Sequence, residues 1–320
     1  MRAPPVTLSG EFNMYSTIIV PLDGSPAAEH ALPWALSIAQ QEGTSLHLVR
    51  VHQLQMPIMV GTEMTADVAV DEVIRHQEME YLTELTARLA KVSTVPVHAS
   101  LLEGSVAEAI HERAQLDKAD LIVLTTHGRG AFASFWLGSA ADAIVRRATT
   151  PTLLVRPTGE HAADLTARPF LKRLVIPLDG SDLAERIVGP ALKLGMACGA
   201  DYDLVMVLEA VPNIEAIAAR KVKIPGGWMP EATLAKAEAY LEHIAHKMRG
   251  HSVIVHQKVI PHGAAASTIL EYAKTHGNPV IALATHGRSG LRKLLLGSTA
   301  DKIIRAAAMP VLVYHPADAD

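Results

Sequence analysis

Residues 126–142 read THGRGAFASFWLGSAAD, and residues 285–301 read THGRSGLRKLLLGSTAD. Both stretches open with Thr-His-Gly-Arg and close with Leu-Gly-Ser, and the spacing between these two ends is the same. Aligned without gaps, residues 120–157 and 279–316 share 17 identities in 38 positions. A repeat of this kind indicates a tandem duplication, and it has to be recognised before any other feature is interpreted.

A second landmark repeats at the same scale, because Pro-Leu-Asp-Gly-Ser occurs at 21–25 and again at 177–181. Two copies of about 145 residues predict two globular domains rather than a solenoid of short repeats. The predicted organisation is a disordered lead-in at 1–14, a first domain at 15–157, a polar linker at 158–170, a second domain at 171–316 and a tail at 317–320.

Composition narrows the class of protein. The 320 residues are 49% hydrophobic, which is ample for two packed cores. A formal net charge of -4 gives no basic field for nucleic acid or an anionic membrane, and no apolar run is long enough to span a bilayer. The single cysteine, Cys198, has no partner for an internal disulfide, which favours a reducing, cytoplasmic location.

Apolar runs alternate with helical patterns in each half, which is typical of βαβ units and a parallel sheet. The sequence therefore predicts an α/β fold with five strands and four helices in each half, the helices covering both faces of an open sheet. In the first half the expected strands lie at 16–23, 45–52, 95–102, 120–127 and 151–157, and the expected helices at 26–41, 67–91, 105–118 and 139–148.

The last strand of each half is short and lies between prolines, Pro151 and Pro157 in the first half and Pro310 and Pro316 in the second. Proline removes a hydrogen-bond donor from a sheet, so this strand is expected at an edge. An uncovered apolar edge favours aggregation. We therefore expect the two last strands to pair with each other as an intrachain pseudo-dimer, while dimerisation of the whole chain stays open.

The repeated loop follows a buried strand and precedes a helix in both halves. Ligands of open parallel sheets bind at the carboxyl ends of the strands, and a helix N-terminus there attracts phosphate. Gly138 and Gly297 would let the backbone approach an anion, and Ser139 and Ser298 would add a hydroxyl donor.

A structural explanation of the same residues stays open. Ser139 with Asp142, and Ser298 with Asp301, also match the spacing of a helix capping box, which would explain them without any ligand. The glycines at 128, 138, 287 and 297 would then be ordinary turn residues.

The motifs P-x-D-G-S, T-H-G-R…L-G-S-x-A-D and a final P-V-L-V strand together resemble the universal stress protein family, in both halves. The resemblance implies two tandem Rossmann-like domains of the adenine nucleotide alpha hydrolase-like type. It implies a sheet of order 3-2-1-4-5, dimerisation through strand five and, in many members, binding of ATP or AMP. Magnesium would accompany ATP.

Nucleotide-binding members carry G-x-x-G, nine residues, then G-[ST]. The first of these glycines is Thr125 in the first half and Ala284 in the second, so the second site is expected to bind nucleotide better. Carried over residue by residue, the resemblance predicts nucleotide contacts from Asp23, Leu46, Thr126, His127, Gly128, Arg129, Gly138, Ser139 and Ala140, and from Asp179, Tyr202, Thr285, His286, Gly287, Arg288, Gly297, Ser298 and Thr299.

The sequence is compatible with two functions. The first is a stress-response or signalling module that binds adenine nucleotide and acts through its conformation or an unknown protein partner. It is not expected to be an enzyme, because no general base, metal cage or nucleophile occurs at a recognisable spacing, and any ATP hydrolysis would be slow. The alternative is a scaffold of the same fold that binds no nucleotide.

Overall fold

The computed structural model of the chain separates into two compact units, Asn13–Pro169 and Phe170–Asp320, called here the N-terminal and C-terminal halves. The residues it describes are 15–40, 43–53, 58–60, 63–65, 68–126, 137–159, 161–208, 231–261, 263–285 and 297–316.

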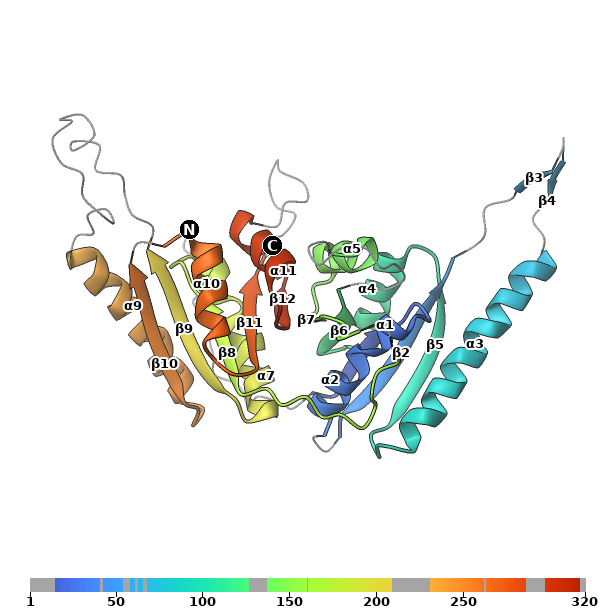
Figure 1. Ribbon diagram of the computed structural model, residues 1–320, viewed down its shortest axis with the longest axis horizontal. Coiled ribbons are helices and arrows are strands. Elements are labelled where there is room, and N and C mark those ends of the chain that lie inside the picture. The colour runs from blue at the N-terminus through green and yellow to red at the C-terminus, as the bar shows by residue number, and fades with distance from the viewer. Residues whose placement is uncertain are drawn as a thin grey trace. The chain divides into compact units, whose positions relative to one another are not determined.

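In the N-terminal half a five-stranded parallel sheet has the order β5-β2-β1-β6-β7 (Figure 1). In chain order this is 3-2-1-4-5, as the resemblance implied. Its strands are β1 (Thr17–Pro21), β2 (Ser45–His52), β5 (Val97–Glu103), β6 (Leu121–Thr125) and β7 (Thr152–Val155), and its helices are α1 (Pro26–Glu29), α2 (Ala31–Ile38), α3 (Val68–Ala90), α4 (Val106–Leu116) and α5 (Ser139–Arg147).

The C-terminal half repeats this sheet in the order β10-β9-β8-β11-β12, again with parallel strands. The strands are β8 (Arg173–Pro177), β9 (Asp201–Leu208), β10 (Val255–Pro261), β11 (Pro279–Ala284) and β12 (Val311–Tyr314), and the helices are α6 (Asp182–Glu185), α7 (Val188–Cys198), α9 (Glu231–Arg249), α10 (Ala265–Lys274) and α11 (Ser298–Ala306).

Helices cover both faces of the N-terminal sheet, and the side chains of β2 show which helix covers which face. Successive side chains of a strand point to opposite faces. His52 contacts Glu78 of α3, whereas His47, an odd number of residues away, contacts Asp117 directly after α4. The helices α3 and α4 therefore pack on opposite faces of β2.

The predicted helix at 26–41 is divided in two, which corrects the sequence-based expectation. The first segment, α1, ends at Glu29, and α2 begins at Ala31. Pro33 has no N–H to donate to the carbonyl of Glu29, and its ring crowds that carbonyl, so a continuous helix is unfavourable. The C-terminal half divides in the same way, between α6 and α7. A continuous helix there would need an N–H at position 190 to donate to the carbonyl of Arg186, and Pro190 has none.

Two further features complete the N-terminal half. Residues 52–66 include a short antiparallel pair, β3 (Ile58–Val60) and β4 (Glu63–Thr65), which the sequence did not predict. The segment predicted as a linker packs on this half: the His30 Nε2–H donates to the carbonyl of His161 at 2.9 Å, and Ser37 donates to the carbonyl of Pro169 at 2.7 Å. None of the helices in the described ranges has the length and apolar character that a bilayer crossing requires.

Candidate functional site

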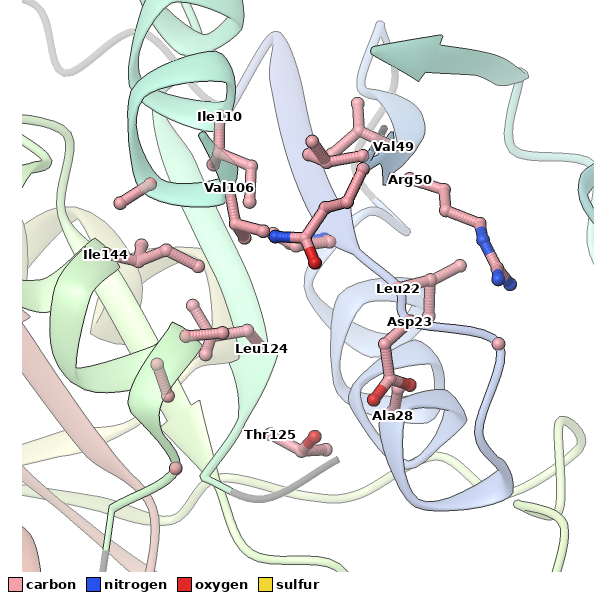
Figure 2. A pocket seen from close by; sticks show the side chains of 18 of the residues that line it. Leu22, Asp23, Ala28, Val49, Arg50, Val106, Ile110, Leu124, Thr125 and Ile144 are labelled. Carbon is pink, nitrogen blue, oxygen red and sulfur yellow. The ribbon is translucent and has the colours of Figure 1, made fainter. Parts of the chain in front are cut away.

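A crevice opens at the carboxyl ends of β1 and β6, which are neighbours in the N-terminal sheet (Figure 2). This is the position at which parallel sheets of this topology bind ligands, because the strand order reverses there. The crevice, called here the N-terminal crevice, has a volume of about 1200 Å³, which is large enough for a nucleotide-sized ligand. Its lining includes Asp23, Val49, Thr125, Gly138 and Ser139.

The turn that follows β1 is built by the Asp-Gly-Ser sequence. Gly24 has a φ of +82°, a left-handed conformation that favours glycine. Ser25 caps α1, because its Oγ accepts the N–H of Ala28 at 3.2 Å. Asp23 accepts the N–H of Ser25 at 2.9 Å, which orients its carboxylate at the mouth of the crevice.

The C-terminal half builds the same turn after β8. Gly180 has a φ of +83°, and Asp179 accepts the N–H of Ser181 at 2.9 Å. The predicted pair Asp23 and Asp179 therefore occupies equivalent positions, each at the carboxyl end of the central strand of its sheet.

The two ends of the repeated loop meet in the N-terminal half. The N–H of Gly138 donates to the carbonyl of Thr126 at 2.7 Å. The N–H of Thr126 in turn donates to the carbonyl of Val155 at 2.9 Å. The Gly138 amide is thus occupied by the protein itself. The amides that follow it, at Ser139 and Ala140, belong to the first turn of α5 and precede its first intrahelical bond.

The capping-box alternative is also corrected. The residue that caps α5 is Gly138, and the one that caps α11 is Gly297, so Ser139 and Ser298 are the first residues of their helices. The aspartates three positions further on pair within the helix instead. Asp142 accepts from Arg146 at 2.7 Å, and Asp301 accepts from Arg305 at 2.9 Å. Ser139 and Ser298 are exposed and do not cap their helices.

Backbone conformation does not explain the two capping glycines. Gly138 has φ −58° and ψ 149°, and Gly297 has φ −52° and ψ 143°. Any residue adopts these angles without strain. The remaining physical reason for glycine at both positions is space, because a side chain there would stand at the N-terminus of the helix, in the N-terminal half directly on the wall of the crevice.

Leu46 and Tyr202 lie elsewhere than the resemblance implied. Leu46 is the second residue of β2 and is fully buried. Val49, three residues later in the same strand, does line the crevice. Tyr202 is also fully buried, and its hydroxyl donates to the carbonyl of Leu192 in α7 at 2.7 Å. Both side chains belong to the core near the amino ends of their strands, and Val49 takes the place of Leu46 on the crevice wall.

The other predicted residues are divided by what the structure describes. Thr126 and Thr285 directly follow the fourth strand of each sheet and are buried, at 4% and 0% exposure. Ala140 lines the N-terminal crevice, and Thr299 lies in the first turn of α11. Six predicted residues lie outside the described residues: His127, Gly128, Arg129, His286, Gly287 and Arg288.

Sequence reasoning missed a charged wall of the crevice. Arg50 lines it, and Arg50 Nη2 lies 3.0 Å from Oε1 of the buried Glu78. The guanidinium carbon also lies 5.5 Å from the ring centre of Tyr81. A signal was present, since β2 reads SLHLVRVH, and an arginine within a buried parallel strand needs a partner or a function. The strand β9 has Met206 at the equivalent position.

Within the described ranges, no three histidine, cysteine, aspartate or glutamate side chains are grouped so that they could hold a metal ion.

Comparison with known proteins agrees with the fold and the duplication. The model of the universal stress protein family matches residues 14–156 and again residues 171–315. A universal stress protein of Mycobacterium tuberculosis is 25% identical over 308 residues, which cover 92% of this chain and 96% of that protein. One from Thermus aquaticus is 35% identical over 144 residues, covering 45% of this chain and all of that shorter protein.

Solved structures show the same architecture. The crystal structure of a universal stress protein from Archaeoglobus fulgidus superposes with a TM-score of 0.66 at 15% sequence identity, covering 95% of this chain and 100% of that one. Both halves therefore carry the family's sequence pattern and its fold. The chain belongs to the universal stress protein family, as a member with two tandem domains.

Proposed function

We propose that this protein binds an adenine nucleotide, ATP or AMP, at the crevice at the carboxyl ends of β1 and β6. The observation that carries the proposal is the pair of glycines that cap α5 and α11 in conformations open to any residue. Space at the helix N-terminus is what a phosphate group needs, and the first-turn amides with the positive end of the helix dipole would bind it.

Three further features support the same site. The crevice has the volume for a nucleotide, and Asp23 supplies a hydrogen-bond acceptor at its far side from α5 (Figure 2). The side chains of Val49, Ile110 and Ile144 give it apolar walls on which a base can pack. ATP would bring its Mg²⁺ on its phosphates.

We further propose that binding serves signalling in the cytoplasm rather than catalysis, with the bound nucleotide setting the state that a protein partner recognises. The single cysteine suits a reducing compartment. We also propose that β7 and β12, each the last strand in the order of its own sheet, pair with each other as an intrachain pseudo-dimer. Slow hydrogen exchange of the outer-edge amides of both strands in the intact chain would support this, and rapid exchange would oppose it.

Nucleotide binding is tested by releasing any ligand from the purified chain with acid and identifying it, followed by calorimetric titration with ATP and AMP. A ligand at a hundred times its dissociation constant stabilises the folded state by about 2.7 kcal/mol, so a thermal shift is a second readout. If neither nucleotide is carried through purification, binds on titration or shifts the unfolding temperature, the second candidate applies. That candidate is a scaffold without a ligand, and the occupied amide of Gly138 is the observation that favours it.

A further inference from the structure

The two halves differ in charge at the wall of the crevice formed by β2 and α3. In the N-terminal half Arg50 of β2 pairs with Glu78 of α3. Matching backbone hydrogen bonds show which residues of β2 and β9 are equivalent. The Leu22 N–H donates to the carbonyl of Val49 in one half, and the Leu178 N–H donates to the carbonyl of Val205 in the other. By this register Met206 stands in the place of Arg50. Along the helix, the buried Leu82, Leu85 and Leu89 match Leu241, Ile244 and Met248, which puts Ala237 in the place of Glu78.

The guanidinium of Arg50 is held against the turn that carries Asp23. A Cβ placed on Gly24 would overlap Nη1 of Arg50, so the group lies directly on the Gly24 backbone. The equivalent Gly180 has open space at the same position. In Figure 2, Arg50 and Asp23 lie on the same side of the crevice, across from Ile110 and Ile144 of α4 and α5.

An aspartate and an arginine on one wall have complementary hydrogen-bonding roles. A carboxylate only accepts, and a guanidinium only donates. A pair of neighbouring hydroxyl groups both donates and accepts, so a ribose diol matches the two side chains together. The phosphate-binding end of the crevice, at α5, lies on the opposite wall, as a nucleotide laid across the strand ends would require.

We propose that Arg50 is a ligand-binding residue that selects, with Asp23, for the ribose diol of the nucleotide in the N-terminal crevice, and that Glu78 and His52 position it. This proposal rests on the proposed nucleotide site. The C-terminal half, with Met206 and Ala237, lacks this means of recognising the diol.

The positioning role of His52 follows from its contacts. The ring is fully buried, with Nδ1 2.8 Å from Oε2 of Glu78 and Nε2 2.9 Å from Oδ1 of Asp71. Carboxylates cannot donate when ionised, so both ring nitrogens must carry a proton to make both bonds. Glu78 thus uses one oxygen for the imidazolium and the other for Arg50.

Among the described residues, the charged groups that contact His52 belong to one chain of contacts. On α3, Asp71 also accepts from Arg75 at 3.1 Å, and on β5 Glu103 accepts from the same arginine at 2.8 Å. Burial lowers the pKa of His52, but the hydrogen bonds and charges of Glu78 and Asp71 outweigh it and raise the pKa above 6.5. Loss of the His52 proton would leave a ring nitrogen facing a carboxylate and would release Glu78 from its fixed position.

The test compares ATP with 2′,3′-dideoxy-ATP by calorimetric titration of the full chain and its variants. In the wild type we expect ATP to bind about tenfold or more tightly than the dideoxy analogue, because hydrogen bonds to a charged donor are lost with the hydroxyls. Arg50→Met introduces the residue of the C-terminal half. It should weaken ATP binding about tenfold and dideoxy-ATP binding less than twofold.

Two more variants separate recognition from folding. Arg50→Met with Glu78→Ala recreates the uncharged pair of the C-terminal half and leaves no buried carboxylate without its arginine, so it should fold and show the same loss for ATP. Arg147→Met removes an arginine that pairs with Glu108, outside this cluster, and that does not line the crevice. It should leave the preference for ATP over the dideoxy analogue unchanged.

The pH dependence tests the positioning role. As the pH rises through the raised pKa of His52, and above the second phosphate pKa of about 6, wild-type affinity for ATP should fall by about threefold to tenfold. His52→Gln should remove this fall. Equal losses for ATP and dideoxy-ATP in Arg50→Met, or an unchanged ATP affinity, would overturn the proposal. If the wild type bound neither ATP nor AMP, the proposed function on which this inference rests would be removed instead.

Discussion

Nδ1 of His47 lies 2.5 Å from the carboxylate of Asp117, and the C-terminal half contains the same pair with its members exchanged. There the strand residue is Asp203 and the residue after the helix is His276, with Nε2 3.6 Å from the carboxylate. The strand positions correspond because Leu22 bonds to Val49 and Leu178 to Val205, and Asp117 and His276 precede the aligned segments 120–157 and 279–316 by the same three residues. Both halves thus have a contact between a histidine and an aspartate at this place, but the strand carries the histidine in one half and the aspartate in the other.

This exchange predicts coupling between the two positions in the N-terminal half. His47→Asp would place two carboxylates together, and Asp117→His would place two imidazoles together. Each substitution should therefore destabilise that half by about 1–3 kcal/mol. The loss of stability in the double variant should be about 1 kcal/mol smaller than the sum of the two single losses. Wild-type stability should not be fully restored, because the aspartate of the exchanged pair, Asp203, also pairs with Arg173 in the C-terminal half. Denaturant unfolding of the three variants measures this. Strict additivity would contradict it.

The stability of the N-terminal half should depend on the protonation of His52. Its pKa is raised in the folded state, so the stabilisation is fully present below about pH 6.5, the unfolded value, and is lost as pH rises through the folded pKa. Denaturant unfolding at a series of pH values above 6.5 should show a declining free energy of unfolding. His52→Leu, which places the residue found at Leu208 in the C-terminal half, should be less stable at pH 6 and show a flatter profile. An equal decline in that variant would contradict the assignment to His52.

Substitution at the helix cap should separate binding from folding. The backbone angles of Gly138 suit any residue, so Gly138→Val is expected to fold with an unfolding temperature within a few degrees of the wild type. Its branched side chain would occupy the space before the first-turn amides of α5 and lower nucleotide affinity at least tenfold. Calorimetric titration and thermal unfolding check both parts. Gly297→Val should do the same in the C-terminal half.

The hydroxyl of Ser139 should contribute less than the space at Gly138. Ser139→Ala is expected to lower nucleotide affinity by about threefold to tenfold, since one hydrogen bond to a phosphate oxygen is lost. Thr149→Ala provides the control, because Thr149 follows the other end of α5 and accepts from Gln115. Equal effects of the two substitutions would show that Ser139 does not contact the ligand.

The single thiol should react slowly in the folded protein. Burial raises the pKa of Cys198 to about 11, so at pH 8 only about one molecule in a thousand carries a thiolate. Labelling with a disulfide reagent at pH 8 should therefore be slow in buffer and rapid in denaturant. Fast labelling of the native chain would show that the segment around Cys198 opens readily.

The sequence by itself determined the duplication, the α/β class and the crevice, because these depend on local and repeating signals. Alternating apolar runs fix strands and helices, and Pro-Leu-Asp-Gly-Ser fixes a turn through the left-handed φ of Gly24 and the capping hydroxyl of Ser25. Membership of the universal stress protein family followed from the same motifs.

Only the tertiary structure decided which side chains reach the crevice. Leu46 and Val49 lie on the same strand, look alike in sequence and are both fully buried, yet Val49 lines the crevice and Leu46 does not. Arg50, Glu78 and His52 come from β2 and α3, and no local pattern links residues that are 26 or 28 positions apart. Such contacts depend on how a helix packs across a strand, and that is settled by the whole fold rather than by neighbouring residues.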